Sequence, residues 1–177
     1  GPVRVELGTR TIFNLLGPLS NPAGVSRQVV GVFSQSWVEP IAQVLQSLGS
    51  ESVWVVHGAD GLDEITITGP THVTALDKGT LKNFTVSPDD FGLKIAKIET
   101  IKGQDAHYNA QALREVVEGK RNPYRDIAVM NAAAGLVVAH KTQSLREAAQ
   151  IAEAAIDDGR VRHVLESLIL ASKESNA

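Results

Sequence analysis

The chain has 177 residues, a net charge of −3 and a pI of about 6.0, and this balance gives no electrostatic reason to expect nucleic acid or a membrane as a partner. It contains no cysteine, which excludes disulfides, thiolate nucleophiles and cysteine-based zinc sites and fits a reducing compartment. No apolar run approaches the roughly 18 residues of a membrane-spanning helix.

Two apolar runs rich in β-branched residues, Gln28–Phe33 and Ser52–His57, predict buried strands. The apolar residues between them recur at helical spacing: Val38, Ile41, Ala42, Leu45 and Leu48. Strand, helix and strand in this order predict a right-handed βαβ unit. Continuous apolar runs are also typical of parallel strands that are buried on both faces.

Shorter strand-like pieces follow, with turn residues between them: Ile65–Thr68, Thr71–Asp77, Leu81–Val86 and Lys94–Thr100. The last third of the chain predicts helices at Ala106–Val117, from Pro123 to about His140, after the capping-box pair Ser144 and Glu147, and from Val161. We therefore expect one α/β domain over residues 1–177, with a mostly parallel central sheet, an antiparallel extension and flanking helices.

A loop with two glycines and two adjacent carboxylates follows the second predicted strand, at His57–Glu64. We call this segment the acidic turn. Like charges about 4 Å apart repel by on the order of 4 kcal/mol at an effective dielectric of 20, and a shared divalent cation removes this cost. The pair Asp63 and Glu64 is therefore a candidate Mg²⁺ site, although a solvated acidic turn remains the alternative.

A second candidate stretch, residues 4–22, holds Arg4 and Arg10 among glycine, proline and asparagine residues. Arginine can bind a planar carboxylate through two parallel hydrogen bonds, but from the residues alone a surface ion pair is the better explanation for each of them. The five histidines lack zinc-site spacing, and no P-loop, dinucleotide-binding or nucleophile-elbow motif occurs. Asn131, on the apolar face of its predicted helix, is explained by an amide bonded to backbone.

The two candidate stretches together resemble anthranilate phosphoribosyltransferase. The family pattern V-R-x-x-L-G-x-R-T-x-F-N-x-L-G-P-L-x-N-P-A is matched from Val3 to Ala23, and H-G-x-D-G-L-D-E from His57 to Glu64. Asn131–Ala134 is similar to the family's N-A-A-A helix. The resemblance covers essentially the whole chain and implies the α/β fold of the C-terminal domain of nucleoside phosphorylases and phosphoribosyltransferases.

The resemblance implies a magnesium-dependent transfer of phosphoribosyl from phosphoribosyl pyrophosphate (PRPP) to the amine of anthranilate, in tryptophan biosynthesis. Arg4 would bind the anthranilate carboxylate, and Asp63 and Glu64 would hold Mg²⁺ on the pyrophosphate. The resemblance gives no side-chain nucleophile or general base, so we assign no catalytic residue. It also implies a cytoplasmic enzyme that is a homodimer at full length.

The family's glycine-rich G-T-G-G-D loop and its K-H-G-N segment do not occur in this sequence. The family carries both ahead of the region matched here, with a helical domain. We therefore expect the chain to be the C-terminal part of a larger enzyme and to lack transferase activity alone. Two other hypotheses stay open: a relative of pyrimidine nucleoside phosphorylase, and a non-catalytic remnant that binds metal or phosphate.

Overall fold

The computed structural model describes residues 13–174, which form parts of two compact units that we describe separately. The first unit contains the residues up to Ile65 together with Pro70–Val86. The second contains Thr66–Gly69 and the residues from Ser87 onward. The expectation of one domain over residues 1–177 stays a prediction. Within the described residues, no helix combines the length and the apolar character needed to cross a membrane.

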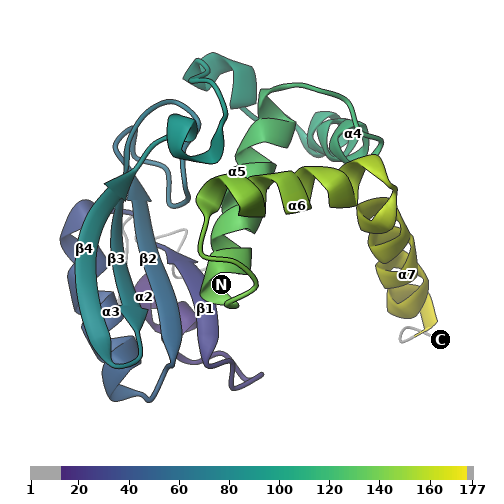
Figure 1. The fold of residues 1–177 in the computed structure, drawn as a ribbon. Coiled ribbons are helices and arrows are strands. Elements are labelled where there is room, and N and C mark those ends of the chain that lie inside the picture. The colour runs from purple at the N-terminus through teal and green to yellow at the C-terminus, as the bar shows by residue number, and fades with distance from the viewer. Residues whose placement is uncertain (1–12, 175–177) are drawn as a thin grey trace, which may run out of the picture. The chain divides into compact units, whose positions relative to one another are not determined.

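The first unit is built on a sheet of four strands that are hydrogen-bonded in sequence order (Figure 1). The strands are β1 (Arg27–Gly31), β2 (Ser52–Gly58), β3 (Thr71–Asp77) and β4 (Thr80–Val86). Helix α3 (Val38–Ser47) connects the parallel strands β1 and β2, which confirms the predicted βαβ unit. Helix α2 (Phe13–Leu19) precedes β1, and the 3-10 turn η1 (Gln35–Trp37) precedes α3.

The sheet is mixed, so the expectation of a mostly parallel sheet is wrong for the described residues. Strand β2 pairs with β3, and β3 with β4, in the antiparallel sense. A parallel pair needs a long crossover, usually a helix, and among the connections between these four strands only the one from β1 to β2 contains an α-helix, α3. The two-residue turn Lys78-Gly79 instead sends the chain back along its neighbour. The predicted strand Thr71–Asp77 is confirmed as β3, and Leu81–Val86 lies within β4.

Two other predicted strands do not form. At Ile65–Thr68 the backbone N–H of Thr68 donates to Thr66 Oγ1 at 3.0 Å, so this buried segment turns instead of extending. The segment Lys94–Thr100 runs into the short 3-10 helix η3 (Ile98–Ile101). The strand prediction fails at Ile65–Thr68 because a short apolar run does not distinguish a strand from a buried turn. It fails at Lys94–Thr100 because these residues are mostly exposed, so no buried face favours a strand there.

One face of the sheet packs against α3, and this contact forms the core of the first unit. Its buried members come from β1, the residue after it, α3, β2 and β3: Val30, Val32, Val38, Ile41, Ala42, Leu45, Val53, Val55 and Leu76. Burying one such large aliphatic side chain contributes about 1.5–3 kcal/mol. On another part of the sheet, the rings of Trp54 and Phe84 meet edge to face at 5.2 Å. The core therefore fixes β1 and β2, whose carboxyl ends carry the candidate site.

The second unit is helical (Figure 1). Its helices are α4 (Ala106–Val117), α5 (Pro123–Val138), α6 (Leu145–Asp157) and α7 (Arg160–Glu174), and the 3-10 turn η2 (Pro88–Phe91) precedes them with η3. Helices α5 and α6 pack through small buried residues that allow close approach: Ala133, Ala134, Ala148, Ala149 and Ala152. The four predicted helices are thus confirmed.

The helix starts follow from their capping residues. Asn122 Oδ1 accepts a hydrogen bond from the Arg125 N–H at 2.9 Å, and Pro123 begins α5 as expected. Ser144 Oγ accepts from the Glu147 N–H at 3.3 Å at the start of α6. Each bond satisfies a backbone donor that has no partner within the helix.

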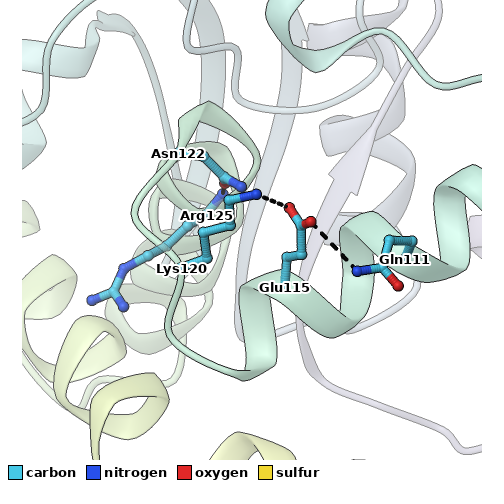
Figure 2. A network of polar contacts seen from close by, with 5 residues as sticks. All are labelled: Gln111, Glu115, Lys120, Asn122 and Arg125. Carbon is cyan, nitrogen blue, oxygen red and sulfur yellow. Dashed lines mark hydrogen bonds and ion pairs between the residues drawn. The ribbon is translucent and has the colours of Figure 1, made fainter.

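The corner between α4 and α5 is joined by surface polar contacts (Figure 2). The Glu115 carboxylate accepts from Lys120 Nζ at 2.7 Å and from Gln111 Nε2 at 3.4 Å. The bond from Lys120, followed by that from Gln111, lowers the pKa of Glu115. These groups are on the surface and belong to the helical scaffold of the second unit.

Candidate functional site

The acidic turn leaves the end of β2 and folds back on itself. Gly58 N–H donates to Leu62 O at 2.9 Å, and Gly61 N–H donates to Gly58 O at the same distance. Gly61 has a φ of 96°, a conformation that favours glycine. The side chains of Asp63 and Glu64 then follow and are exposed. A buried strand followed by a tight turn therefore presents two adjacent carboxylates at the surface.

The main chain of Asp63 lies against Gly31, the last residue of β1. A Cβ atom at Gly31 would stand 1.6 Å from Asp63 O and 2.5 Å from its carbonyl carbon, distances that real Cβ atoms essentially never show. The lack of a side chain at Gly31 therefore lets the acidic turn reach the carboxyl end of β1. Sites in α/β sheets commonly lie beyond the carboxyl ends of strands.

The ends of β1 and β2 are joined by two further bonds. His57 Nδ1 lies 2.8 Å from Val32 O, and because a carbonyl oxygen only accepts, Nδ1 carries the proton and donates. Val32 N–H donates to Val56 O at 3.0 Å. His57 is half-buried and begins the acidic turn. Its imidazole therefore ties the start of the turn to the segment after β1.

A pocket of about 190 Å³ borders this arrangement. It is lined by Leu15 and Pro18 of α2, Gly31–Phe33, Ile41 of α3 and Asp63. Asp63 is the charged residue of this lining. Pockets for whole small molecules usually span roughly 300–1,000 Å³. A pocket of this size suits a part of a larger ligand or a hydrated ion.

Two aspartates of the turn act on the carboxyl group of Glu64. Although Glu64 is exposed as a residue, its carboxyl group is partly desolvated, and this desolvation raises the pKa of Glu64. Repulsion from Asp63 and then from Asp60 raises this pKa further. Asp60 Oδ1 also accepts from the Leu62 N–H at 3.2 Å, which holds that charge within the turn. A bound cation would favour the ionised form of Glu64 and oppose this shift.

The donor set fits Mg²⁺ shared with a ligand. In residues 13–174, no three His, Cys, Asp or Glu side chains gather into a group that could hold a metal ion. Mg²⁺ commonly takes only one or two carboxylates and completes its coordination with phosphate oxygens and water. Asp63 and Glu64 can supply the two carboxylates, and a phosphate-bearing ligand would supply the rest.

Three other residues were singled out in the sequence: Arg4, Arg10 and Asn131. Arg4 and Arg10 lie outside the described residues. Asn131 Nδ2 donates to Ile127 O at 3.0 Å, in agreement with its interpretation as an amide bonded to the backbone. Gly31 was missed in the sequence. Its signal is a single glycine inside an apolar strand, which often marks a close approach of backbone.

The chain is similar to known proteins over nearly its whole length. Residues 1–162 match the glycosyl transferase family, a/b domain. The chain is 57% identical to an anthranilate phosphoribosyltransferase of Agrobacterium fabrum over 177 residues, which are all of this chain and 52% of that protein. It is 59% identical to that of Rhodopseudomonas palustris (strain BisB5) over 169 residues, which are 96% of this chain and 50% of the relative. The chain thus spans about half the length of the curated relatives it matches.

Solved structures give the same result. The anthranilate phosphoribosyltransferase of Thermus thermophilus matches with a TM-score of 0.83 and 40% identity, over 94% of this chain and 49% of that one. The anthranilate phosphoribosyltransferase of Saccharomyces cerevisiae in complex with PRPP and Mg matches with a TM-score of 0.83 and 33% identity, over 93% of this chain and 48% of that one. These matches confirm the resemblance to anthranilate phosphoribosyltransferase, and with the matched family domain they show that the chain belongs to this glycosyl transferase family.

Proposed function

We propose that the chain is the C-terminal α/β part of an enzyme that transfers phosphoribosyl from PRPP to the amine of anthranilate in tryptophan biosynthesis. The observation that carries this proposal is the packing of the Asp63 main chain against Gly31, at the end of β1 and beside a pocket that Asp63 lines. Glu64 is the next residue of the turn. A solved relative in complex with PRPP and Mg supports the same ligands here. A cytoplasmic location and a homodimeric full-length enzyme belong to this proposal.

The residues of this chain have two tasks in the proposed reaction. Asp63 and Glu64 hold Mg²⁺ through carboxylate oxygens, and the bound ion neutralises charge on the departing pyrophosphate. Arg4 binds the anthranilate carboxylate by paired N–H donors, which orients the amine. The bond from ribose C1 to a pyrophosphate oxygen breaks, a bond from C1 to the amine nitrogen forms, and the amine loses a proton. No side-chain nucleophile is required.

The transferase hypothesis is favoured over the phosphorylase hypothesis by the relatives. Proteins that are 56–59% identical to this chain carry the transferase name. The hypothesis of a non-catalytic remnant predicts binding without turnover, even when the chain is joined to a complementary half. An experiment that joins a complementary half to this chain therefore separates the transferase hypothesis from the hypothesis of a non-catalytic remnant.

The test joins the part of the Agrobacterium fabrum relative that this chain does not cover to the amino terminus of this chain. Anthranilate consumption with PRPP and Mg²⁺ is then followed by fluorescence. We expect Mg²⁺-dependent turnover, and a fall in kcat/KM of about 100-fold or more in the Asp63→Asn/Glu64→Gln variant, because several kcal/mol of charge stabilisation are lost. The control Asp89→Asn/Glu118→Gln removes two exposed charges of the second unit and should retain activity. A joined protein that folds but does not turn over would contradict the proposal.

A further inference from the structure

We infer that the end of β1 positions the magnesium site, through the missing side chain of Gly31 and the hydrogen bond between Val32 and His57. Neither Gly31 nor His57 is one of the proposed metal ligands, so both are positioning residues. The inference rests on the proposed function, because it takes the carboxylates of Asp63 and Glu64 as those ligands. It adds the reason why they stand where they do.

The contact at Gly31 involves backbone on both sides. The atoms that an added Cβ would meet at 1.6 and 2.5 Å are the carbonyl oxygen and carbon of Asp63, which cannot swing aside as a flexible side chain could. Either β1 or the acidic turn must therefore move when a methyl group is added.

Strand β1 is the less movable of the two. Gly31 is paired with Val56 of β2 in a parallel ladder, and its neighbours Val30 and Val32 are only 5% and 4% exposed. Asp63, in contrast, lies in an exposed turn. We therefore expect Gly31→Ala to displace the main chain of Asp63, and with it both carboxylates, while the sheet stays in place.

His57 acts on the same turn from its other end. Its Nδ1–H donates to Val32 O at 2.8 Å, which fixes the first residue of the turn relative to the end of β1. An asparagine at this position carries an N–H at a similar distance from its own backbone, whereas phenylalanine keeps the ring and loses the donor. The variants His57→Asn and His57→Phe therefore separate the hydrogen bond from the bulk of the side chain.

The experiment uses the 177-residue chain labelled with ¹⁵N and titrated with magnesium pyrophosphate. In Gly31→Ala we expect the amide resonances of Asp63 and Glu64 to shift in the absence of ligand, and the affinity for magnesium pyrophosphate to fall about 10- to 100-fold, as is usual when the support of a metal ligand is lost. Gly135→Ala on α5 is the matched control, because nothing lies within 4 Å of an added Cβ there. His57→Phe should weaken binding, and His57→Asn should restore most of it.

The outcomes separate the inference from the proposed function. If the wild type fails to bind magnesium pyrophosphate, the proposed metal site is wrong. If the wild type binds and Gly31→Ala binds equally well, or leaves the Asp63 amide unmoved, only the inference is wrong. Should Gly31→Ala fail to fold, the His57 variants decide: equal affinities for His57→Phe, His57→Asn and the wild type would overturn the inference.

Discussion

Arg125 and Asp157 form an ion pair at 2.5 Å although the Arg125 side chain is only 1% exposed. Arg125 Nη1 also donates to Gly119 O at 3.2 Å, so one cation joins the end of α4 to α5 and α6 (Figure 2 shows Arg125). The hydrogen bond from Arg125 is the main cause that lowers the pKa of Asp157. Buried charge of this kind is tolerated only when it is paired, so the second unit depends on this contact.

Replacement of Arg125 by lysine is expected to destabilise the chain. A lysine side chain is shorter, so its ammonium does not reach the position of Arg125 Nη1, which donates to both Gly119 O and Asp157 Oδ1. Loss of one charged hydrogen bond costs about 1.5–3 kcal/mol. Urea denaturation should show the free energy of unfolding of Arg125→Lys reduced by this amount. Arg114→Lys, an exposed change on α4, should stay within about 0.5 kcal/mol of the wild type. Equal stability of the two variants would refute the importance of the buried pair.

The binding of Mg²⁺ should depend on pH through Glu64. Its pKa is raised above 4.5 by burial and by Asp63 and Asp60, so binding should weaken as the pH falls through this raised value and Glu64 becomes protonated. Asp60→Asn removes one repelling charge and keeps the oxygen that accepts from the Leu62 N–H. The midpoint of the pH profile should therefore move to lower pH in this variant.

The profile is measured by titration with magnesium pyrophosphate over a series of pH values. Asp77→Asn serves as the control. Gly58 of the acidic turn pairs with Thr71 at the start of β3, whereas Asp77 lies at the other end of that strand. It should leave the midpoint unchanged. A midpoint that does not respond to Asp60→Asn would show that Glu64 is not the titrating group.

The repulsion of Glu64 by Asp63 and Asp60 should lower the stability of the folded chain when no metal is bound. Because the pKa of Glu64 is higher in the folded than in the unfolded chain, ionised Glu64 destabilises the fold at pH values above both, and the effect disappears below the unfolded value. Asp63→Asn should therefore raise the Tm at neutral pH without metal. Magnesium pyrophosphate should raise the Tm of the wild type but not of Asp63→Asn. A metal-induced rise of equal size in both proteins would argue against Asp63 as a ligand.

The sequence predicted those features that local patterns determine. The runs at Gln28–Phe33 and Ser52–His57 and the helical spacing between them indicated the βαβ unit, and the pair Asp63 and Glu64 was visible as adjacent carboxylates after a strand. The contact between Asp63 and Gly31 was not predictable, because it joins residues far apart in the chain.

Burial also misled the strand predictions. The segment Ile65–Thr68 has the apolar residues of a core strand, and Ile65 and Ile67 are indeed fully buried. Its backbone nevertheless turns, because the Thr66 hydroxyl accepts the Thr68 N–H. Tertiary position, and not local preference, decides such short segments.

The 177-residue chain alone is expected to show no steady turnover of PRPP and anthranilate. It spans about half the length of its curated relatives, and the described pocket of about 190 Å³ is smaller than the pockets that usually hold a whole small molecule. Anthranilate fluorescence in the presence of PRPP and Mg²⁺ should stay constant, whereas the joined protein described above consumes the substrate. Turnover by the chain alone would refute this prediction.

Calorimetric titration of the 177-residue chain with pyrophosphate, in the presence and absence of Mg²⁺, tests the shared-cation site most directly. The wild type should bind pyrophosphate only when Mg²⁺ is present, and the Asp63→Asn/Glu64→Gln variant should not bind it in either condition. The control Asp89→Asn/Glu118→Gln should bind like the wild type. Equal Mg²⁺-dependent binding by the wild type and the Asp63→Asn/Glu64→Gln variant would contradict the assignment of these two carboxylates.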